Sequence, residues 1–102
     1  MTNIEAEEVK LRLDAGEELN LVDVREPHEN QEFNIGGILL PLGNIQTMQL
    51  DDIEDLRDQE VIFYCRSGVR SNMAAIIAEQ MGFTNTKNLT GGMLGWQSKF
   101  PV

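Results

Sequence analysis

The sequence predicts an α/β domain in which a small parallel β-sheet is covered by helices on both faces. Short strand-like segments, most of them apolar, recur near residues 20–24, 37–41, 60–64 and 86–89. Helix-like segments separate them, as the crossovers between parallel strands require. The 102 residues, of which 41% are hydrophobic, suffice for one core, so we expect a single domain over residues 1–102.

A helix is predicted near the N-terminus, because Ala6, Val9 and Leu13 recur at helical spacing. Residues 2–5 have the pattern of a capping box, and Gly16 suits the end of a helix. A strand before this helix has only two or three residues available. We therefore expect the first strand of the sheet to be a stub.

The next predicted strand, Leu19 to Val24, is a nearly continuous apolar run. Asp23 near its carboxyl end is a candidate buried acid, and Arg25 is the closest basic residue. We expect this pair to brace the neighbouring loops rather than to react. Pro27 is expected to end the strand. His28 is the only histidine, and we do not expect it to serve as a base for a nucleophile.

The remaining elements follow from turn signals and apolar patterns. A strand over residues 37–41 is entered through a glycine turn, and Asp51 to Leu56 suits a short helix. Ser71 is expected to cap the next helix, whose segment Met73 to Ala78 is apolar almost all round, as in a helix packed tightly on a sheet. Trp96 is expected in the core.

The strongest functional signal is the stretch Val61 to Ser71. Four apolar residues lead into Cys65, the only cysteine, and a polar loop and a helical run follow. Open α/β sheets place their chemistry in such loops, and the helix directs N–H groups and a positive dipole at them. A lone cysteine is more often an inert core residue, but Arg66 and Arg70 would be costly to bury beside it. We therefore predict that Cys65 is a reactive thiolate beside an anion site.

This loop resembles the active-site loop of the rhodanese family, the thiosulfate sulfurtransferases and related sulfur carriers. Leu21 to Glu26 resembles the first signature of that family, and Gly91 to Trp96 resembles its last. Residues 34–42 depart from the family, because they lack the histidine and the proline of the His-Ile-Pro-Gly-Ala segment that many rhodaneses have. The resemblance implies one rhodanese-like three-layer sandwich with four to five strands.

The resemblance also implies sulfur transfer by covalent catalysis. Thiolate Cys65 would take the outer sulfur of thiosulfate or of another persulfide donor, and a thiophilic acceptor such as cyanide or a protein thiol would remove it. The loop that follows is implied to bind the small anionic donor and the persulfide. Its residues are Arg66, Ser67, Gly68, Val69, Arg70 and Ser71. No cofactor is required, and we expect no metal, because the sequence has no cluster of metal ligands.

Two alternatives stay open. A non-catalytic or carrier-type rhodanese module in a protein sulfur relay would keep the same cysteine. A cysteine phosphatase also sets a cysteine and an arginine in a loop before a helix, with one more residue between them than the four that separate Cys65 from Arg70. The smaller ring suits a sulfur atom better than a phosphate, so the phosphatase is the less favoured alternative.

Composition narrows the partners and the location. The net charge of −9 disfavours nucleic acid and anionic membranes as partners. No apolar run approaches the roughly 20 residues that span a membrane, and Met1 to Glu5 lack the basic and apolar regions of a signal peptide. One cysteine forms no internal disulfide, and a reactive thiol needs a reducing compartment. We therefore expect a cytoplasmic protein.

Overall fold

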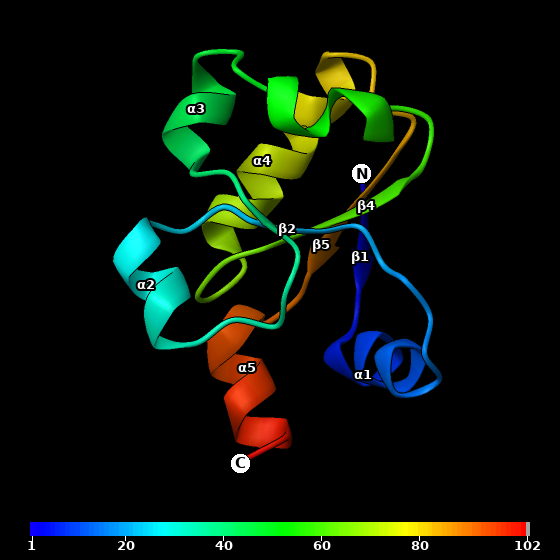
Figure 1. The fold of residues 1–102 in the computed structure, drawn as a ribbon, viewed down its shortest axis with the longest axis vertical. Helices are drawn as coiled ribbons and strands as arrows, with labels where there is room; N and C mark the ends of the chain where they lie inside the picture. Colours follow the sequence, from blue (N-terminus) through cyan, green and yellow to red (C-terminus); the bar gives the residue numbers. More distant parts are fainter. Residues whose placement is uncertain (102) are drawn as a thin grey trace.

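The computed structural model describes residues 1–101, and they form a three-layer α/β sandwich around one parallel sheet (Figure 1). The five strands lie in the order β1-β5-β4-β2-β3, and every neighbouring pair is parallel. Their bounds are β1 (Thr2–Ile4), β2 (Leu21–Asp23), β3 (Ile38–Leu39), β4 (Glu60–Tyr64) and β5 (Asn85–Leu89). The predicted α/β sandwich is thus confirmed, and the N-terminal stub is the edge strand β1.

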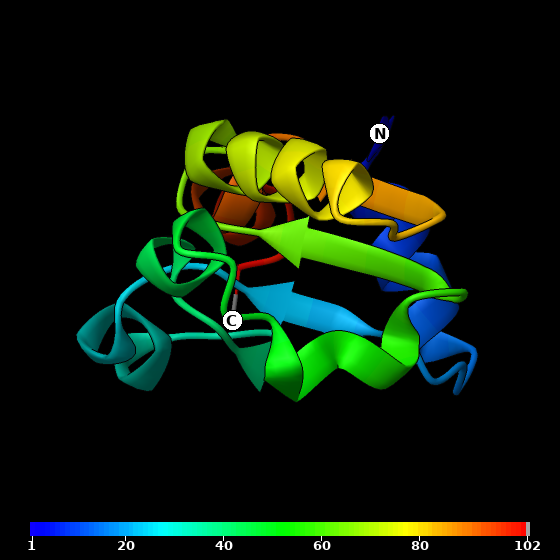
Figure 2. The same ribbon diagram turned by 90° about the horizontal axis from the view of Figure 1, so that it is seen from above.

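The helices divide between the two faces of the sheet (Figures 1 and 2). They are α1 (Ala6–Asp14), α2 (Pro27–Glu32), α3 (Leu42–Gln46), the 3₁₀ helix η1 (Asp51–Leu56), α4 (Val69–Gln80) and α5 (Gly92–Lys99). Side chains of α3, η1 and α4 form one apolar cluster with the sheet, and those of α1 and α5 form the other. In the described part of the chain, no helix has both the length and the apolar character to cross a bilayer.

The central position of β4 in the sheet explains why residues 61–64 are all apolar. Val61 and Phe63 point into the cluster beneath α4, while Ile62 and Tyr64 point into the cluster beneath α1 and α5. All four are fully buried because β4 lies between β5 and β2 and is covered on both faces. The strand is therefore a rigid support for whatever follows its carboxyl end.

The segment after β2 differs from the prediction. Pro27 does not mark the end of a strand. It occupies the first turn of α2, where a backbone N–H would have no partner within the helix. Glu26 precedes the helix, and its backbone N–H donates to the Glu29 carboxylate at 3.1 Å in a capping box. A proline suits the first turn of a helix as well as the end of a strand, and Pro27 takes the first of these places.

Two predicted caps are also wrong. Residues 2–5 do not form a capping box, because Thr2–Ile4 pair with β5 as a strand and Glu5 makes no side-chain cap. Ser71 does not cap α4, because the helix starts at Val69 after Gly68, which has a left-handed backbone with φ 105°. Ser71 consequently lies inside the first turn of the helix, with its side chain fully buried.

Candidate active site

Cys65 stands at the carboxyl edge of the sheet, directly after β4, and the chain turns there into α4. A second contact fixes the loop from the side of α5: the backbone N–H groups of Met93 and Leu94 donate to the carbonyls of Cys65 and Arg66 at 2.9 and 3.0 Å. Gly92 permits this approach, since a Cβ atom there would lie 2.5 Å from both carbonyl oxygens. The loop is held between two helices.

The sulfur of Cys65 accepts several hydrogen bonds from the start of α4. The backbone N–H of Gly68 lies 3.1 Å from Sγ, and the N–H and hydroxyl of Ser71 each lie 3.3 Å from it. The thiol is almost completely buried, with 1% of Cys65 exposed. Such a ring of donors suits a sulfur that carries negative charge.

The pKa of Cys65 lies below its ordinary value, as the sequence predicts, but for a different reason. Burial raises the pKa of the thiol, and hydrogen bonds from the Ser71 hydroxyl and from backbone N–H groups lower it by more. Arg66 and Arg70 are not among the main causes of the shift. The hydrogen bonds supply it instead, because Ser71 is turned inward.

Arg70 is held by an acid that the sequence analysis did not single out. Its guanidinium donates to both carboxylate oxygens of Glu29 at 2.8 and 2.9 Å, so the pair joins the first turn of α4 to α2. This hydrogen bonding holds the pKa of Glu29 at about 2. The hydrogen bonds to Glu29 also raise the pKa of Arg70, and a negative charge on Cys65 raises it further.

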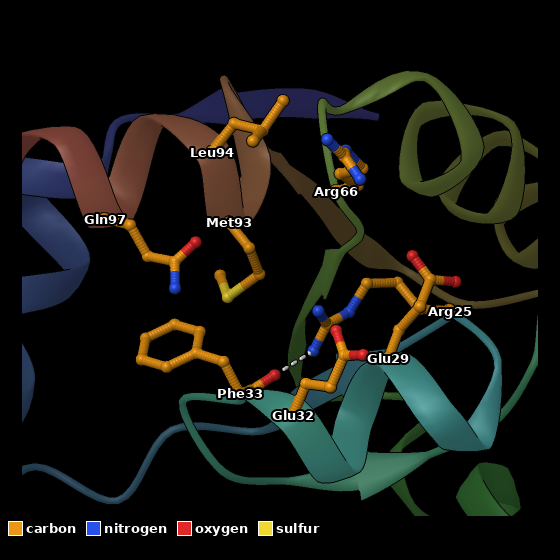
Figure 3. Close-up of a pocket in the computed structure, with 8 residues that line it drawn as sticks. All are labelled: Arg25, Glu29, Glu32, Phe33, Arg66, Met93, Leu94 and Gln97. Carbon is orange, nitrogen blue, oxygen red and sulfur yellow. Dashed lines mark hydrogen bonds between the residues drawn. The ribbon is translucent and has the colours of Figure 1, made fainter.

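Arg66 follows Cys65 in the chain, and its side chain is exposed and lines a pocket of about 240 Å³ (Figure 3). Met93 and Gln97 of α5 line this pocket opposite Glu32 and Phe33, which lie at the end of α2. The remaining lining residues are Arg25, Glu29 and Leu94. The segment that resembles the last signature of the family thus reaches this pocket through Met93 and Leu94.

Arg25 and Asp23 form the predicted buried pair. The guanidinium of Arg25 donates to the two oxygens of Asp23 at 2.9 and 2.7 Å, and also to the carbonyl of Phe33 at 2.5 Å (Figure 3). Asn30 donates to Asp23 at 2.9 Å. These bonds brace α2 and the chain after it against β2, and they pair the charge of Arg25, which lines the pocket, with that of Asp23.

The other predicted loop residues have unequal places. Ser67 and Val69 are exposed, and in residues 1–101 the N–H of Val69 donates no hydrogen bond to the sulfur. His28 is exposed on α2 and makes no hydrogen bond to Cys65 within that same range. A residue that sequence reasoning missed is Asn88 of β5, which contacts Ser71 at 2.5 Å. Its signal was a polar side chain in a buried strand.

The fold and this loop define an α/β protein whose buried cysteine is surrounded by donors from the N-terminal turn of a helix. The chain belongs to the rhodanese-like domain family, whose model matches residues 5–99.

Known proteins agree with this membership. A sulfurtransferase of Allochromatium vinosum is 34% identical over 97 residues, which are 94% of this chain and 88% of that protein. A putative sulfur carrier protein of Bacillus subtilis, YrkF, is 34% identical over 97 residues, and the chain spans about half of its length, 51%. The human single-domain sulfurtransferase TSTD1 has the same fold, with a TM-score of 0.79 over 95% of this chain and 96% of that one, at 24% identity.

Proposed function

We propose that this protein is a sulfurtransferase in which Cys65 carries the transferred sulfur as a persulfide. The observation that supports this most directly is the set of donors around Sγ, from Gly68 and from the N–H and hydroxyl of Ser71. They favour negative charge on a thiolate and, after transfer, on the outer sulfur of a persulfide. The relatives named sulfurtransferase and sulfur carrier agree with this chemistry.

In the first half-reaction, the Cys65 thiolate attacks the outer sulfur of thiosulfate or of another sulfane donor. A new S–S bond forms, the S–S bond of the donor breaks, and sulfite leaves thiosulfate with the electron pair of that bond. Arg66 suits the attraction of such a small anion, because its charge is exposed beside the nucleophile and in the described residues no acid pairs with it.

In the second half-reaction, a thiophilic acceptor attacks the outer sulfur of the persulfide. The bond between the two sulfurs breaks, and Cys65 leaves as the thiolate that began the cycle. Cyanide serves as acceptor in an assay, and we propose a protein thiol as acceptor in a reducing compartment such as the cytoplasm. The cycle is redox-neutral, so the protein needs no cofactor.

A phosphatase reading is disfavoured by the place of Arg70. An arginine that binds phosphate oxygens must offer its N–H groups to the substrate. Here the guanidinium of Arg70 donates to both oxygens of Glu29 on α2 instead. In addition, only four residues separate Cys65 from Arg70, one fewer than in the loop of a cysteine phosphatase.

The second candidate function is carriage of sulfur within a protein relay, with little turnover on small donors. The burial of Cys65 favours it: only 1% of the residue is exposed, and Arg66 next to it in the chain lines the pocket of about 240 Å³, so only a slender donor group reaches the sulfur. The terminal sulfur of a cysteine persulfide is such a slender group, and so is the outer sulfur of thiosulfate. The name of the YrkF relative points in the same direction.

Intact-protein mass spectrometry after incubation with thiosulfate tests the proposal. The wild type should gain the mass of one sulfur atom and lose it on treatment with cyanide or a reducing thiol, while Cys65→Ser should gain none. Steady-state thiocyanate formation then separates the enzyme from the carrier, which loads but turns over slowly. Sulfur uptake by Cys65→Ser, or no uptake by the wild type from thiosulfate or a cysteine persulfide, would refute the proposal.

A further inference from the structure

The hydroxyl of Ser71 has two partners and only one hydrogen. Its Oγ lies 3.3 Å from Sγ of Cys65 and 2.5 Å from Oδ1 of Asn88. A serine hydroxyl donates one hydrogen bond and accepts others, so it can donate to the sulfur or to the amide oxygen, not to both at once. The two arrangements differ in which group receives the proton of Ser71.

The short distance to Asn88 fits a hydroxyl that donates to the amide oxygen, while the N–H groups of Gly68 and Ser71 donate to Sγ in either arrangement. At 2.5 Å, the contact between Ser71 and Asn88 is that of an O–H···O bond donated to the amide oxygen. The Ser71 oxygen is then left to accept a bond from the thiol of Cys65. A thiolate at Cys65 needs the opposite direction, because it has no hydrogen to give and is stabilised by a hydroxyl that donates to it.

Asn88 is the group that can reverse this direction. An asparagine carries an acceptor and a donor at the two ends of one amide, so half a turn of the amide replaces Oδ1 by Nδ2 beside Ser71. Its Nδ2 has no hydrogen-bond partner among residues 1–101, although Asn88 as a whole is buried, with 6% of its surface exposed. The amide borders a pocket of about 400 Å³ behind the loop, lined also by Gly68 and Asn72. The turn therefore breaks no bond within the protein except the one to Ser71.

We propose that Asn88 is a positioning residue for Cys65, whose amide directs the Ser71 hydroxyl toward the amide oxygen when the sulfur is a thiol and toward the sulfur when it is charged. Strand β5 holds Asn88 between β1 and β4, so only the side chain changes. The inference rests on Cys65 as the reacting sulfur of the proposed function.

Charged groups also surround the loop, and the test must leave them unchanged. Those that face it from the neighbouring elements are Arg66 of the loop, Arg70 of α4, Glu29 of α2 and the paired Asp23 and Arg25 beside β2. Met93 and Leu94, through which α5 binds the loop, are uncharged. Substitutions at Asn88 alter none of these contacts.

The pH dependence of Cys65 alkylation by iodoacetamide provides the test. In Asn88→Asp the side chain offers only acceptors, so the Ser71 hydroxyl remains directed away from the sulfur. The alkylation midpoint should rise by about one pH unit, which is about tenfold less thiolate at a pH below both midpoints. Asn72→Asp is the matched control, because it puts the same charge in the same pocket without a bond to Ser71. It should shift the midpoint by much less.

The same substitutions in a Ser71→Ala protein show whether the shift in the alkylation midpoint passes through the Ser71 hydroxyl or comes from the added negative charge alone. Adding Asn88→Asp there should move the midpoint no further than Asn72→Asp does in the wild type. Equal shifts from the two aspartates, or an Asn88→Asp shift that persists undiminished without the hydroxyl, would overturn the proposal. Alkylation requires only a thiolate, so a failure of sulfur transfer leaves this result readable.

The wild type offers a measurement that does not depend on the folding of a variant. The side-chain amide resonances of Asn88 should move with pH at the midpoint of Cys65 alkylation, and by more than those of Asn72 in the same pocket. Resonances of Asn88 that stay constant through that midpoint would show that its amide does not follow the charge on the sulfur, and the proposal would be wrong.

Discussion

Glu29→Gln isolates the contact that joins the active-site loop to α2. The carboxylate accepts two hydrogen bonds from Arg70, and its side chain is only 18% exposed. The substitution keeps the size of the side chain and removes its charge. It therefore leaves the guanidinium of Arg70 without the charged partner that fixes it against α2, and we expect the folded protein to lose stability.

The expected loss follows from the pKa of Glu29, which is lowered from 4.5 to about 2 in the folded protein. A shift of that size corresponds to at most about 3 kcal/mol. The side chain of Arg70 is 34% exposed, so water screens part of the attraction, and we expect about 1 to 2 kcal/mol. For a domain of this size the fall in Tm at pH 7 should be roughly 5–15 °C.

The pH dependence gives the sharper test. A carboxylate whose folded pKa is depressed contributes stability above its unfolded pKa and loses it as the pH falls through the folded value. The difference between wild type and Glu29→Gln should therefore be complete at pH 6–7, shrink below about pH 4.5 and vanish near pH 2. Glu32→Gln is the control, because Glu32 lies on the same helix and in the same pocket, and Arg70 donates to Glu29 rather than to it. Thermal melts in which the two variants agree at pH 7, or in which the Glu29→Gln deficit persists at pH 2.5, would refute this reasoning.

The remaining predictions concern the arginines and the glycine beside α5. Arg66→Ala should raise KM for thiosulfate several-fold and leave Tm within about 2 °C of the wild type, since an exposed charge contributes little to stability; a Tm loss as large as that of Arg70→Ala would reverse their roles. Arg70→Ala should lower both Tm and turnover, because the loop loses its tie to α2. Gly92→Ala should cost about 2 kcal/mol or more in denaturant unfolding, because its Cβ would meet the carbonyl oxygen of Cys65, whereas Gly95→Ala, in open space, should be neutral or stabilising.

The sequence carries the fold and the nucleophile because both depend on short stretches of chain. The buried run of β4 leads into Cys65 without interruption, so strand, turn and thiol can be predicted together. The Asp23–Arg25 pair was predictable for the same reason, since its members lie two residues apart.

Contacts between residues far apart in the chain could not be predicted from local sequence patterns. Glu29 lies 41 residues before Arg70, and only the fold of α2 brings it to the loop. Its capping box with Glu26 was visible in the sequence, and recognising it would have placed the carboxylate on a helix next to the carboxyl edge of the sheet. Ser71 was misplaced because the left-handed backbone of Gly68 starts α4 earlier than a serine cap would.

The donors that lower the pKa of Cys65 are neutral groups, the Ser71 hydroxyl and backbone N–H groups. A free cation in contact with Cys65 would lower the thiol pKa strongly, and the nucleophilicity of a thiolate falls as its pKa falls. Pairing Arg70 with Glu29 offsets the positive charge that stands nearest to the start of α4. Hydrogen bonds from Ser71 and Gly68 lower the pKa while the sulfur remains basic enough to attack a donor. In the proposed persulfide the same donors would stabilise the negative charge on the outer sulfur.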